Sequence, residues 1–370
     1  MKKRSFDPKH RRSPAALLSM SLLLGCSASN PPHDSTGGGG GAQASSSASS
    51  ASSSTGGAAS SSTGTSTSSG AGGSSSSTGA GGAEGKLDGP IDRGGVLVLE
   101  FDSLYFEVEP ALGARISALR FDGKELLTSA MVNAVNWGST FWSSPQSDWG
   151  WPPPTAIDSD AYTPTIDTSS FHVVGKTANF AGKTLSMEKS FAADFQRNAV
   201  VVTYTMHNTG SAPFSVAPWE VTRVAGGLTF FPTGDAQFTP GGSSPLPVDA
   251  AGGVTWFDGA AHPPDNAAKK LNADGKGGWF AHVAGDLLFL KKFADVPLAS
   301  QAPGEGDIEI FAQTAAGGGY IEMENQGAYT PIAPGASSTY TVTWFVRKLP
   351  ANVTASVGSP SLLAFVDSLL

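Results

Sequence analysis

Two glutamates near the C-terminus have a spacing that suits acid/base chemistry. Within the stretch 320–327, Glu322 and Glu324 alternate with the apolar residues Ile321 and Met323. In a β-strand this alternation places both carboxylates on one face, about 7 Å apart. Sheltered from solvent, two like charges raise one another's pKa, so that one of them can act as a general base. The alternative is a strand face that lies in solvent.

A second candidate segment is Pro218-Trp-Glu-Val-Thr-Arg223. Strand alternation puts Trp219 and Arg223 on one face and Glu220 on the other, so either the first two or the last can face a pocket. The alternative is a surface ion pair between Glu220 and Arg223, worth under about 1 kcal/mol.

The residues 136–154 hold four of the chain's eight tryptophans and end in three consecutive prolines. Prolines interrupt sheet pairing, which favours a loop here. The flat indole faces of Trp142, Trp149 and Trp151 suit stacking on sugar rings, and Gln146 can bind hydroxyl groups. The alternative is a hydrophobic loop that closes one end of the fold.

These candidates need an all-β scaffold, and the sequence predicts one. Short β-rich segments alternate with Gly, Pro, Asn and Asp turns throughout 91–350, which we expect to form a single large antiparallel β-sandwich. In the tail 351–370, Ser359 and Pro360 resemble the cap and first turn of a short helix. The clearest strand candidates are 96–101, 104–108, 115–121, 199–206, 287–290 and 339–346.

The N-terminus has the layout of a signal peptide over residues 1–25. A basic leader precedes an apolar run of ten residues, Ala15 to Leu24. This run is too short for a transmembrane helix, which needs about twenty residues. Leu23-Leu-Gly-Cys26 resembles the lipobox of bacterial lipoproteins, which implies export and a lipid anchor on Cys26 in the inner or outer membrane. The alternative is an ordinary secretory cleavage site.

The mature chain is expected to be acidic and to begin with a disordered linker. Residues 26–90 are mostly Ser, Gly, Ala and Thr, which cannot bury a core, and a chain of ~60 such residues spans roughly 40 Å. Without the leader, 17 basic and 30 acidic residues remain, a net charge of −13, which disfavours nucleic acid as a partner. Cys26 is the only cysteine, so we expect no disulfide, thiolate metal site or cofactor.

Over about residues 95–350 the chain resembles the galactose-mutarotase-like, or aldose 1-epimerase-like, proteins, and among them an uncharacterised bacterial branch. The resemblance rests on the order and spacing of Gly113-Ala-Arg-Ile-Ser-Ala-Leu, Asp122-Gly-Lys-Glu-Leu-Leu, Trp137-Gly-Ser-Thr-Phe-Trp, Asn208-Thr-Gly ahead of Pro218-Trp-Glu-Val-Thr-Arg, and Glu324-Asn-Gln ahead of Ile332-Ala-Pro-Gly and Trp344.

The resemblance implies a β-supersandwich with a carbohydrate cleft, in which Glu324 takes the proton from the anomeric hydroxyl. In these epimerases a histidine protonates the ring oxygen. The present sequence has Pro218-Trp-Glu220 at that position, and none of the histidines of the domain matches it. We therefore consider Glu220 as a replacement acid, if burial raises its pKa.

The sequence thus favours a carbohydrate-binding surface lipoprotein, with Trp142, Gln146, Trp149, Trp151, Trp219, Arg223 and Glu322 as the binding residues. One alternative is an aldose 1-epimerase-type isomerase that uses Glu324 and Glu220. A second is a structural envelope protein without a ligand. The sequence leaves the sugar and the oligomeric state open, because function depends on the site and not on the fold.

Overall fold

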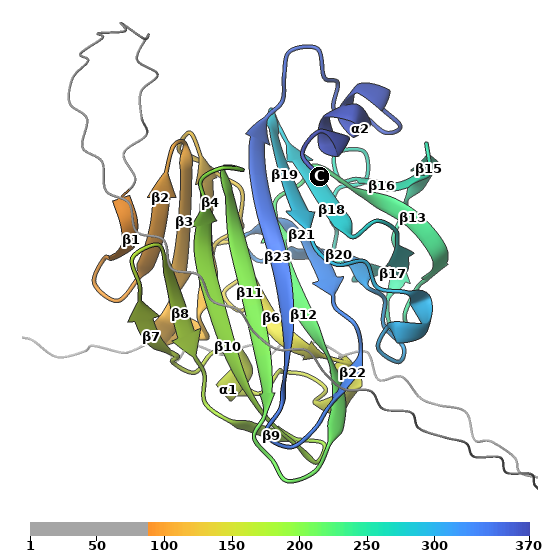
Figure 1. Ribbon diagram of the computed structural model, residues 1–370. Helices are drawn as coiled ribbons and strands as arrows, with labels where there is room; N and C mark the ends of the chain where they lie inside the picture. Colours follow the sequence, from red (N-terminus) through yellow and green to blue (C-terminus); the bar gives the residue numbers. More distant parts are fainter. Residues whose placement is uncertain (1–87) are drawn as a thin grey trace, which may run out of the picture. The chain divides into compact units, whose positions relative to one another are not determined.

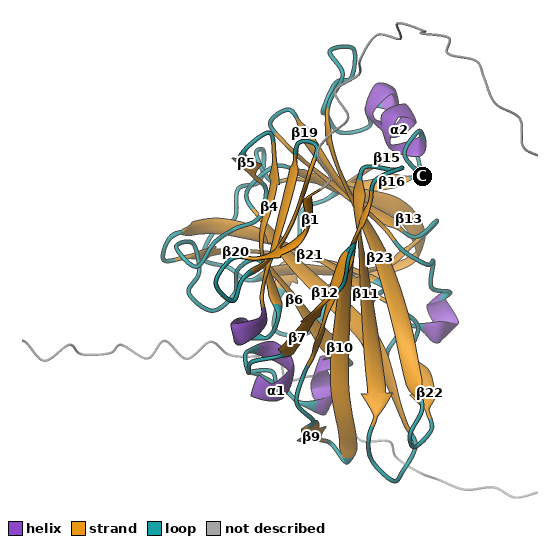
Figure 2. Ribbon diagram, turned by 60° about the vertical axis from the view of Figure 1, so that its left-hand side comes forward, coloured by secondary structure: helices purple, strands orange, loops and turns teal. Residues whose placement is uncertain are grey.

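The structure, a computed structural model, describes residues 88–370. The predicted signal peptide, the lipidated Cys26 and nearly all of the predicted linker lie outside this range. Strands dominate the described residues, as Figures 1 and 2 show. The α-helices there are the single turn α1 (Thr155–Asp158) and α2 (Pro360–Asp367). No helix among the described residues is long and apolar enough to span a membrane.

Two large sheets form the domain, and the first of them, sheet A, positions the candidate residues. Its main strands pair in an antiparallel manner through successive neighbours. In spatial order they are β1 (Asp88–Asp92), β2 (Leu97–Phe101), β3 (Leu104–Glu109), β4 (Arg115–Phe121), β6 (Ser139–Ser144), β12 (Phe214–Val224), β21 (Gly318–Gln326), β20 (Ile308–Ala315) and β17 (Lys269–Gly275). At the margins, β5 (Lys124–Glu125) pairs with β4, β14 (Ser244–Pro245) runs parallel to β17, and β22 (Thr330–Ile332) pairs with β12.

Sheet B packs on sheet A and is also antiparallel. Its strands are, in spatial order, β7 (Thr163–Ile166), β8 (Ser170–Val174), β10 (Lys183–Asp194), β11 (Ala199–Asn208), β23 (Ser337–Lys348), β19 (Leu287–Lys292), β18 (Trp279–Ala284), β13 (Leu228–Phe238), β16 (Val254–Asp258) and β15 (Asp249–Ala251), with β9 (Ala178–Phe180) beside β10. The long strand β13 belongs to both sheets, because its first half pairs with β16 and β18 and its second half with β17.

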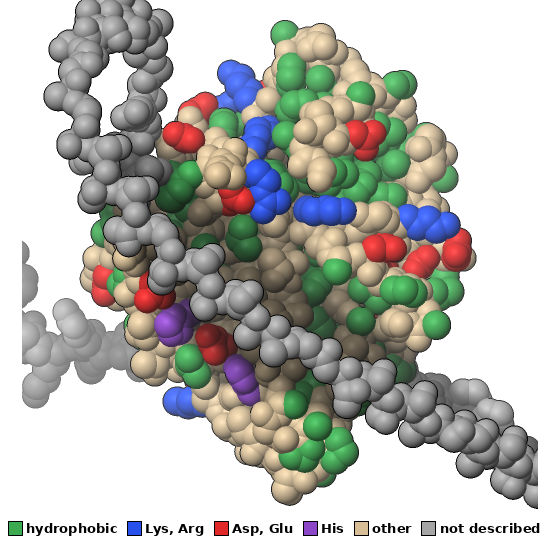
Figure 3. Space-filling model, viewed as in Figure 1, with side chains coloured by type: hydrophobic (Ala, Val, Ile, Leu, Met, Phe, Trp, Pro, Cys, Tyr) green, Lys and Arg blue, Asp and Glu red, His purple; other side chains and the backbone are tan. Residues whose placement is uncertain are grey.

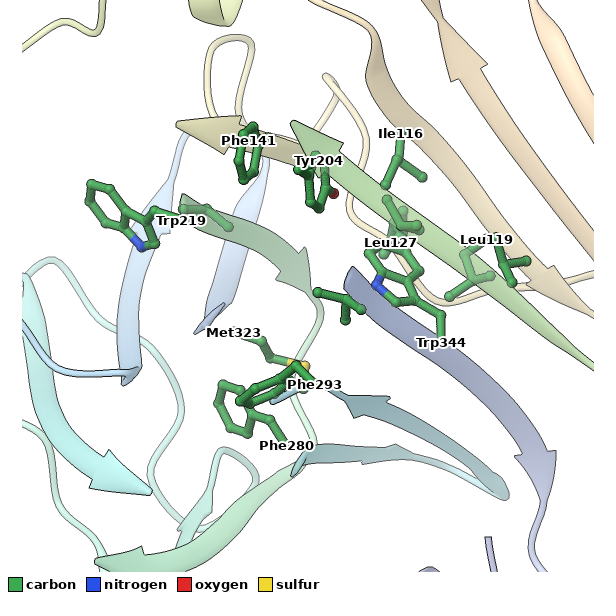
Figure 4. Close-up of a cluster of buried hydrophobic side chains, with 14 of the residues drawn as sticks. Ile116, Leu119, Leu127, Phe141, Tyr204, Trp219, Phe280, Phe293, Met323 and Trp344 are labelled. Atoms are coloured by element: carbon green, nitrogen blue, oxygen red, sulfur yellow. The ribbon is translucent and has the colours of Figure 1, made fainter. Parts of the chain in front are cut away.

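Aromatic side chains fill the space between the two sheets. Phe141 of β6 stacks on Tyr204 of β11 with ring centroids 3.9 Å apart, and Trp344 of β23 packs edge-on against Phe106 and Phe289. Figure 4 shows the Phe141–Tyr204 pair and Trp344 among these buried side chains. Because strand residues alternate between faces, the neighbours of these core residues on sheet A point away from the core. That opposite face carries the candidate site.

The C-terminal tail packs against sheet B and is part of the same compact unit. Leu362 and Val366 of α2 are buried against a second apolar cluster, which includes Phe230 and Trp256. Oγ of Ser359 accepts a hydrogen bond from the Leu362 amide at 3.3 Å, which confirms the predicted helix cap.

The outer face of sheet B is polar. Facing threonine hydroxyls pair across β11 and β23, as Thr203 and Thr341 do at 3.2 Å. On β10 and β11, Glu188 lies 3.4 Å from His207. Figure 3 shows this face with mainly uncharged side chains over β10, β11 and β23. A solvated outer face and an apolar inner face are typical of an antiparallel sandwich, so the predicted fold class is confirmed.

Candidate functional site

A cleft of about 760 Å³ lies on the face of sheet A that is turned away from the core. Strands β6, β12, β21, β20 and β17 form its floor, and its walls are formed by the segments around 133–136, 146–151, 242–243 and 266–268 and by the β20–β21 turn. Six of the residues predicted from the sequence line it together: Trp142, Gln146, Trp151, Trp219, Glu322 and Glu324.

Glu322 and Glu324 lie on the floor of this cleft, on one face of β21, as their alternation predicts. Their neighbours Ile321 and Met323 belong to the hydrophobic core on the opposite side. The exposed fractions of the two glutamates are 8% and 1%. The alternative of a solvated strand face is therefore wrong, since both carboxyls are sheltered.

Glu324 is held by two donors from different strands. Its Oε2 accepts a hydrogen bond from the indole Nε1 of Trp219 at 3.1 Å and from Nζ of Lys270 at 3.3 Å. The same ammonium lies 2.5 Å from Oε2 of Glu309, which stands opposite Glu324 on β20. Lys270 thus bridges two buried carboxyls at the edge of the cleft, and it is the only cationic residue among the described ones that line it.

Burial and charge shift the protonation of this cluster. Burial, followed by the nearby charge of Glu309, raises the pKa of Glu324 well above its ordinary value, although Lys270 opposes the shift. Burial disfavours the charge on Lys270, but the carboxylates of Glu309 and Glu324 more than offset it and raise the lysine pKa. Burial likewise raises the pKa of the adjacent Glu305 to about 9. The cluster therefore retains its ammonium, and burial favours the protonated forms of Glu324 and Glu305.

Arg223 does not line the cleft but holds residues that do. Its side chain is fully buried on the same face of sheet A as Glu322, and its Nε donates to Oε1 of Glu322 at 2.8 Å while Nη1 donates to Oγ1 of Thr140 at 2.9 Å. The guanidinium carbon lies 5.1 Å from the centre of the Trp142 ring. Arg223 is therefore a positioning residue for Glu322 and Trp142.

The predicted tryptophans form one packed cluster rather than an open platform. Trp142 lies on β6, not in the loop expected from the prolines. The centroid of its ring lies 5.4–6.0 Å from those of Trp149, Trp151 and Trp219. Trp142 and Trp219 are almost fully buried and reach the cleft only in part. Trp151 is 37% exposed at the rim, which makes it the indole of the cluster that is open to a ligand.

Trp149 does not line the cleft. Its ring packs against those of Trp142 and Trp219, and its Nε1 donates to the Ser143 carbonyl at 2.8 Å. For this residue the structure agrees with the alternative reading of the loop, an apolar plug.

Glu220 points to the opposite side of sheet A, into the core. It accepts hydrogen bonds from Tyr204 at 2.6 Å and Trp344 at 3.2 Å and lies 2.8 Å from Nζ of Lys291. The structure therefore does not bring Glu220 to Glu324, which corrects its expected role as the acid. It also excludes a surface ion pair with Arg223, since both residues are fully buried and have other partners.

Sequence reasoning missed several residues of the site. Lys270, Phe311 and Gln313 line the cleft on strands that were not connected to Glu324, and Tyr320 lines it from the same strand as Glu324. Alternation in Lys269–Gly275 was the available signal, but it does not show which sheet the strand joins. The described part of the chain contributes no histidine to the cleft, and no group of three His, Cys, Asp or Glu residues there is arranged to hold a metal ion.

The sequence between residues 127 and 347 matches the model of a family described as a domain of unknown function, DUF4380. This match spans more than half of the chain and includes all the residues named as lining the cleft. No curated protein matches the sequence.

Several solved structures share the fold. A candidate aldose 1-epimerase from Escherichia coli K12 superimposes with a TM-score of 0.50 at 12% identity, covering 69% of this chain and 100% of that one. Another from Klebsiella pneumoniae gives a TM-score of 0.50 at 11% identity, over 74% and 82% of the two chains. At such identities the likeness shows the fold alone, and it confirms the aldose 1-epimerase-like architecture.

Proposed function

The chain belongs to the DUF4380 family of domains of unknown function, and we propose that it is a carbohydrate-binding protein whose ligand occupies the cleft on sheet A. The proposal rests on one observation: the exposed indole of Trp151 and several hydrogen-bonding groups line the same concave site. Sugar ligands present apolar C–H faces and a rim of hydroxyls, so they need both kinds of contact.

The hydrogen-bonding groups in the cleft suit hydroxyls. Gln146 and the buried carboxyls of Glu322 and Glu324 offer acceptors, and the carboxamide of Gln146 and the ammonium of Lys270 offer donors. Glu322 and Glu324 are held in fixed positions by Arg223, Trp219 and Lys270. Such preorganisation reduces the entropy lost on binding.

Titration calorimetry of the purified chain with a panel of neutral sugars tests this proposal. The expected result is saturable binding that Glu324→Gln weakens. Asp286→Asn is the matched control, because this acidic side chain is 43% exposed on the β18–β19 turn and lies outside the cleft. If no sugar binds the folded protein, the proposal is wrong.

A second candidate is an aldose 1-epimerase-type isomerase, and the environment of Glu324 favours it. A carboxyl with a raised pKa is a stronger base when it is ionised, which suits removal of a hydroxyl proton. In ring opening, Glu324 takes the proton of the anomeric hydroxyl, the bond between the anomeric carbon and the ring oxygen breaks, and an acid protonates that oxygen.

We infer that Lys270 supplies that second proton, in the role considered for Glu220 from the sequence. The raised pKa of Lys270 makes it a weaker acid than an imidazolium, so slow turnover is expected. Polarimetry of freshly dissolved α-glucose and α-galactose tests this candidate. Acceleration that disappears in both Glu324→Gln and Lys270→Met supports it, and no acceleration with any sugar rejects it.

We further propose that the domain acts at the surface of the bacterial envelope, anchored by a lipid on Cys26. The leader and the Leu-Leu-Gly-Cys sequence support this proposal. The long Ser/Gly-rich linker would let the cleft reach ligands away from the membrane. Two or three acyl chains give stable anchoring where one chain is marginal.

A further inference from the structure

The cleft is longer than a single sugar ring requires. Trp219 of β12 stands opposite Gln326 of β21, and Phe311 of β20 stands opposite Glu322. Gln326 and Glu322 are four residues apart on the same strand, so the positions of Trp219 and Phe311 are about 13 Å apart along the direction of β21. That separation exceeds the span of one pyranose ring.

The end of the cleft near Phe311 differs from the end near Trp151. It is lined by the side-chain amides of Asn133, Asn136, Asn266 and Gln313, and all four are at least partly exposed. The Phe311 ring is half-buried and lies 6.1 Å from that of Tyr320. An aromatic ring surrounded by uncharged amides repeats the contacts that a sugar needs, at a distance from Glu324.

We propose that the cleft binds a neutral oligosaccharide, with one ring between Trp151 and the Glu324–Lys270 pair and the following rings over Phe311 and the carboxamides. This inference rests on the proposed carbohydrate-binding function and extends it to a class of ligand. The two ends are then subsites of one continuous site.

The charges of the cleft favour a neutral ligand over an acidic one. Lys270 is already neutralised by Glu309 at 2.5 Å, and the buried Arg223 by Glu322 at 2.8 Å. No other cation among the described residues lines the cleft. The carboxylate of a uronic acid would therefore lose its hydration without gaining a free cationic partner, which costs binding energy.

The size of the cleft supports the same conclusion. At about 760 Å³ it lies in the upper part of the range of roughly 300–1,000 Å³ that is usual for ligand sites. A monosaccharide would leave either the Trp151 indole or the Phe311 ring without a partner.

Calorimetry with homologous series of one to four units tests the inference. The probes are β-1,4-linked glucose, mannose and xylose, α-1,4-linked glucose, and trigalacturonic acid as the acidic arm. The expected result is that affinity for one neutral series rises about tenfold from the monosaccharide to the trisaccharide, since a second aromatic contact is added. Trigalacturonic acid should bind at least tenfold more weakly than the neutral trisaccharide.

Phe311→Ala should weaken trisaccharide binding more than monosaccharide binding, so that the gain in affinity with chain length is lost. Phe238→Ala is the matched control, because Phe238 is an aromatic residue that is 42% exposed and does not line the cleft. Gln313→Ala provides a second test at the same subsite if the loss of the Phe311 ring unfolds the domain.

Equal affinity for one and three units would overturn the inference while leaving the proposed function intact. So would an equal loss of monosaccharide and trisaccharide affinity in Phe311→Ala, or tighter binding of trigalacturonic acid. Absence of binding to every series would reject both the inference and the proposed function.

Discussion

Nζ of Lys270 lies 3.3 Å from Oε2 of Glu324, on strands that are separated by β20. The pair connects β17 to β21. It places Lys270, the cation of the cleft, beside Glu324, the most deeply buried carboxyl that lines it. Because Glu309 shares the same ammonium, the loss of Lys270 would leave two buried carboxyls without a counter-charge.

We predict that Lys270→Met destabilises the domain by about 3 kcal/mol, since removing one partner of a buried ion pair leaves an uncompensated charge. The free energy of unfolding in urea measures this effect. Lys276→Met is the matched control: Lys276 also pairs with a carboxylate, that of Asp235, but both side chains are exposed. The control should change stability little, and equal losses in the two variants would contradict the prediction.

Trp151→Ala should weaken sugar binding about tenfold, because it removes the exposed ring of the tryptophan cluster. Calorimetry with the tightest sugar of the panel measures the change. Phe195→Ala serves as the control, since Phe195 is similarly exposed at 40% and does not line the cleft. The thermal midpoint should change little in both variants. Unchanged affinity in Trp151→Ala would argue against stacking at the rim.

The sequence predicted much of the fold because strand alternation is a local property. Each of the strand candidates agrees with an observed strand to within about two residues, and Glu322 and Glu324 share one face as expected. Alternation also showed that Trp219 and Glu220 must face opposite sides. It did not show which side was the core. The role considered for Glu220 came from its position in the family resemblance, and its burial against Lys291 excludes that role.

The rest of the site depends on contacts between distant segments. Lys270 reaches Glu324 only because β17 and β21 both pair with β20, and no local pattern fixes that order of strands. The local pattern left open whether Arg223 lies at the surface or in a pocket. The pairing of β12 with β21 brings it to its buried partner, Glu322. Such pairings are set by the topology of the whole sheet.

Cys26→Ala should release the protein from membranes, since the acidic mature chain gains no attraction to anionic lipid. Membrane fractionation of cells that express the wild type and the variant measures the distribution. Ser27→Ala, one residue beyond the predicted lipidation site, is the control and should remain in the membrane fraction. A Cys26→Ala protein that still sediments with membranes would refute the anchor.

The stability of the domain should fall as the pH rises through neutrality, owing to Asp307. Burial, followed by the charge of Asp274, raises the pKa of Asp307 from 3.8 to about 7. The folded protein then binds this proton more tightly than the unfolded chain does. The contribution of the Asp307 proton to the free energy of unfolding is therefore complete below pH 3.8 and is lost as the pH rises through 7.

Asp307→Asn should therefore gain stability relative to the wild type with increasing pH. A shift of this size corresponds to about 4 kcal/mol between pH 4 and pH 8. The asparagine keeps an oxygen that can accept the bonds now donated by the Gly275 amide at 2.8 Å and the Gln301 amide at 3.1 Å. Urea unfolding at several pH values measures the difference. Asp235→Asn, an exposed control, should follow the wild type in parallel, and parallel curves for Asp307→Asn would show that Asp307 is ionised throughout.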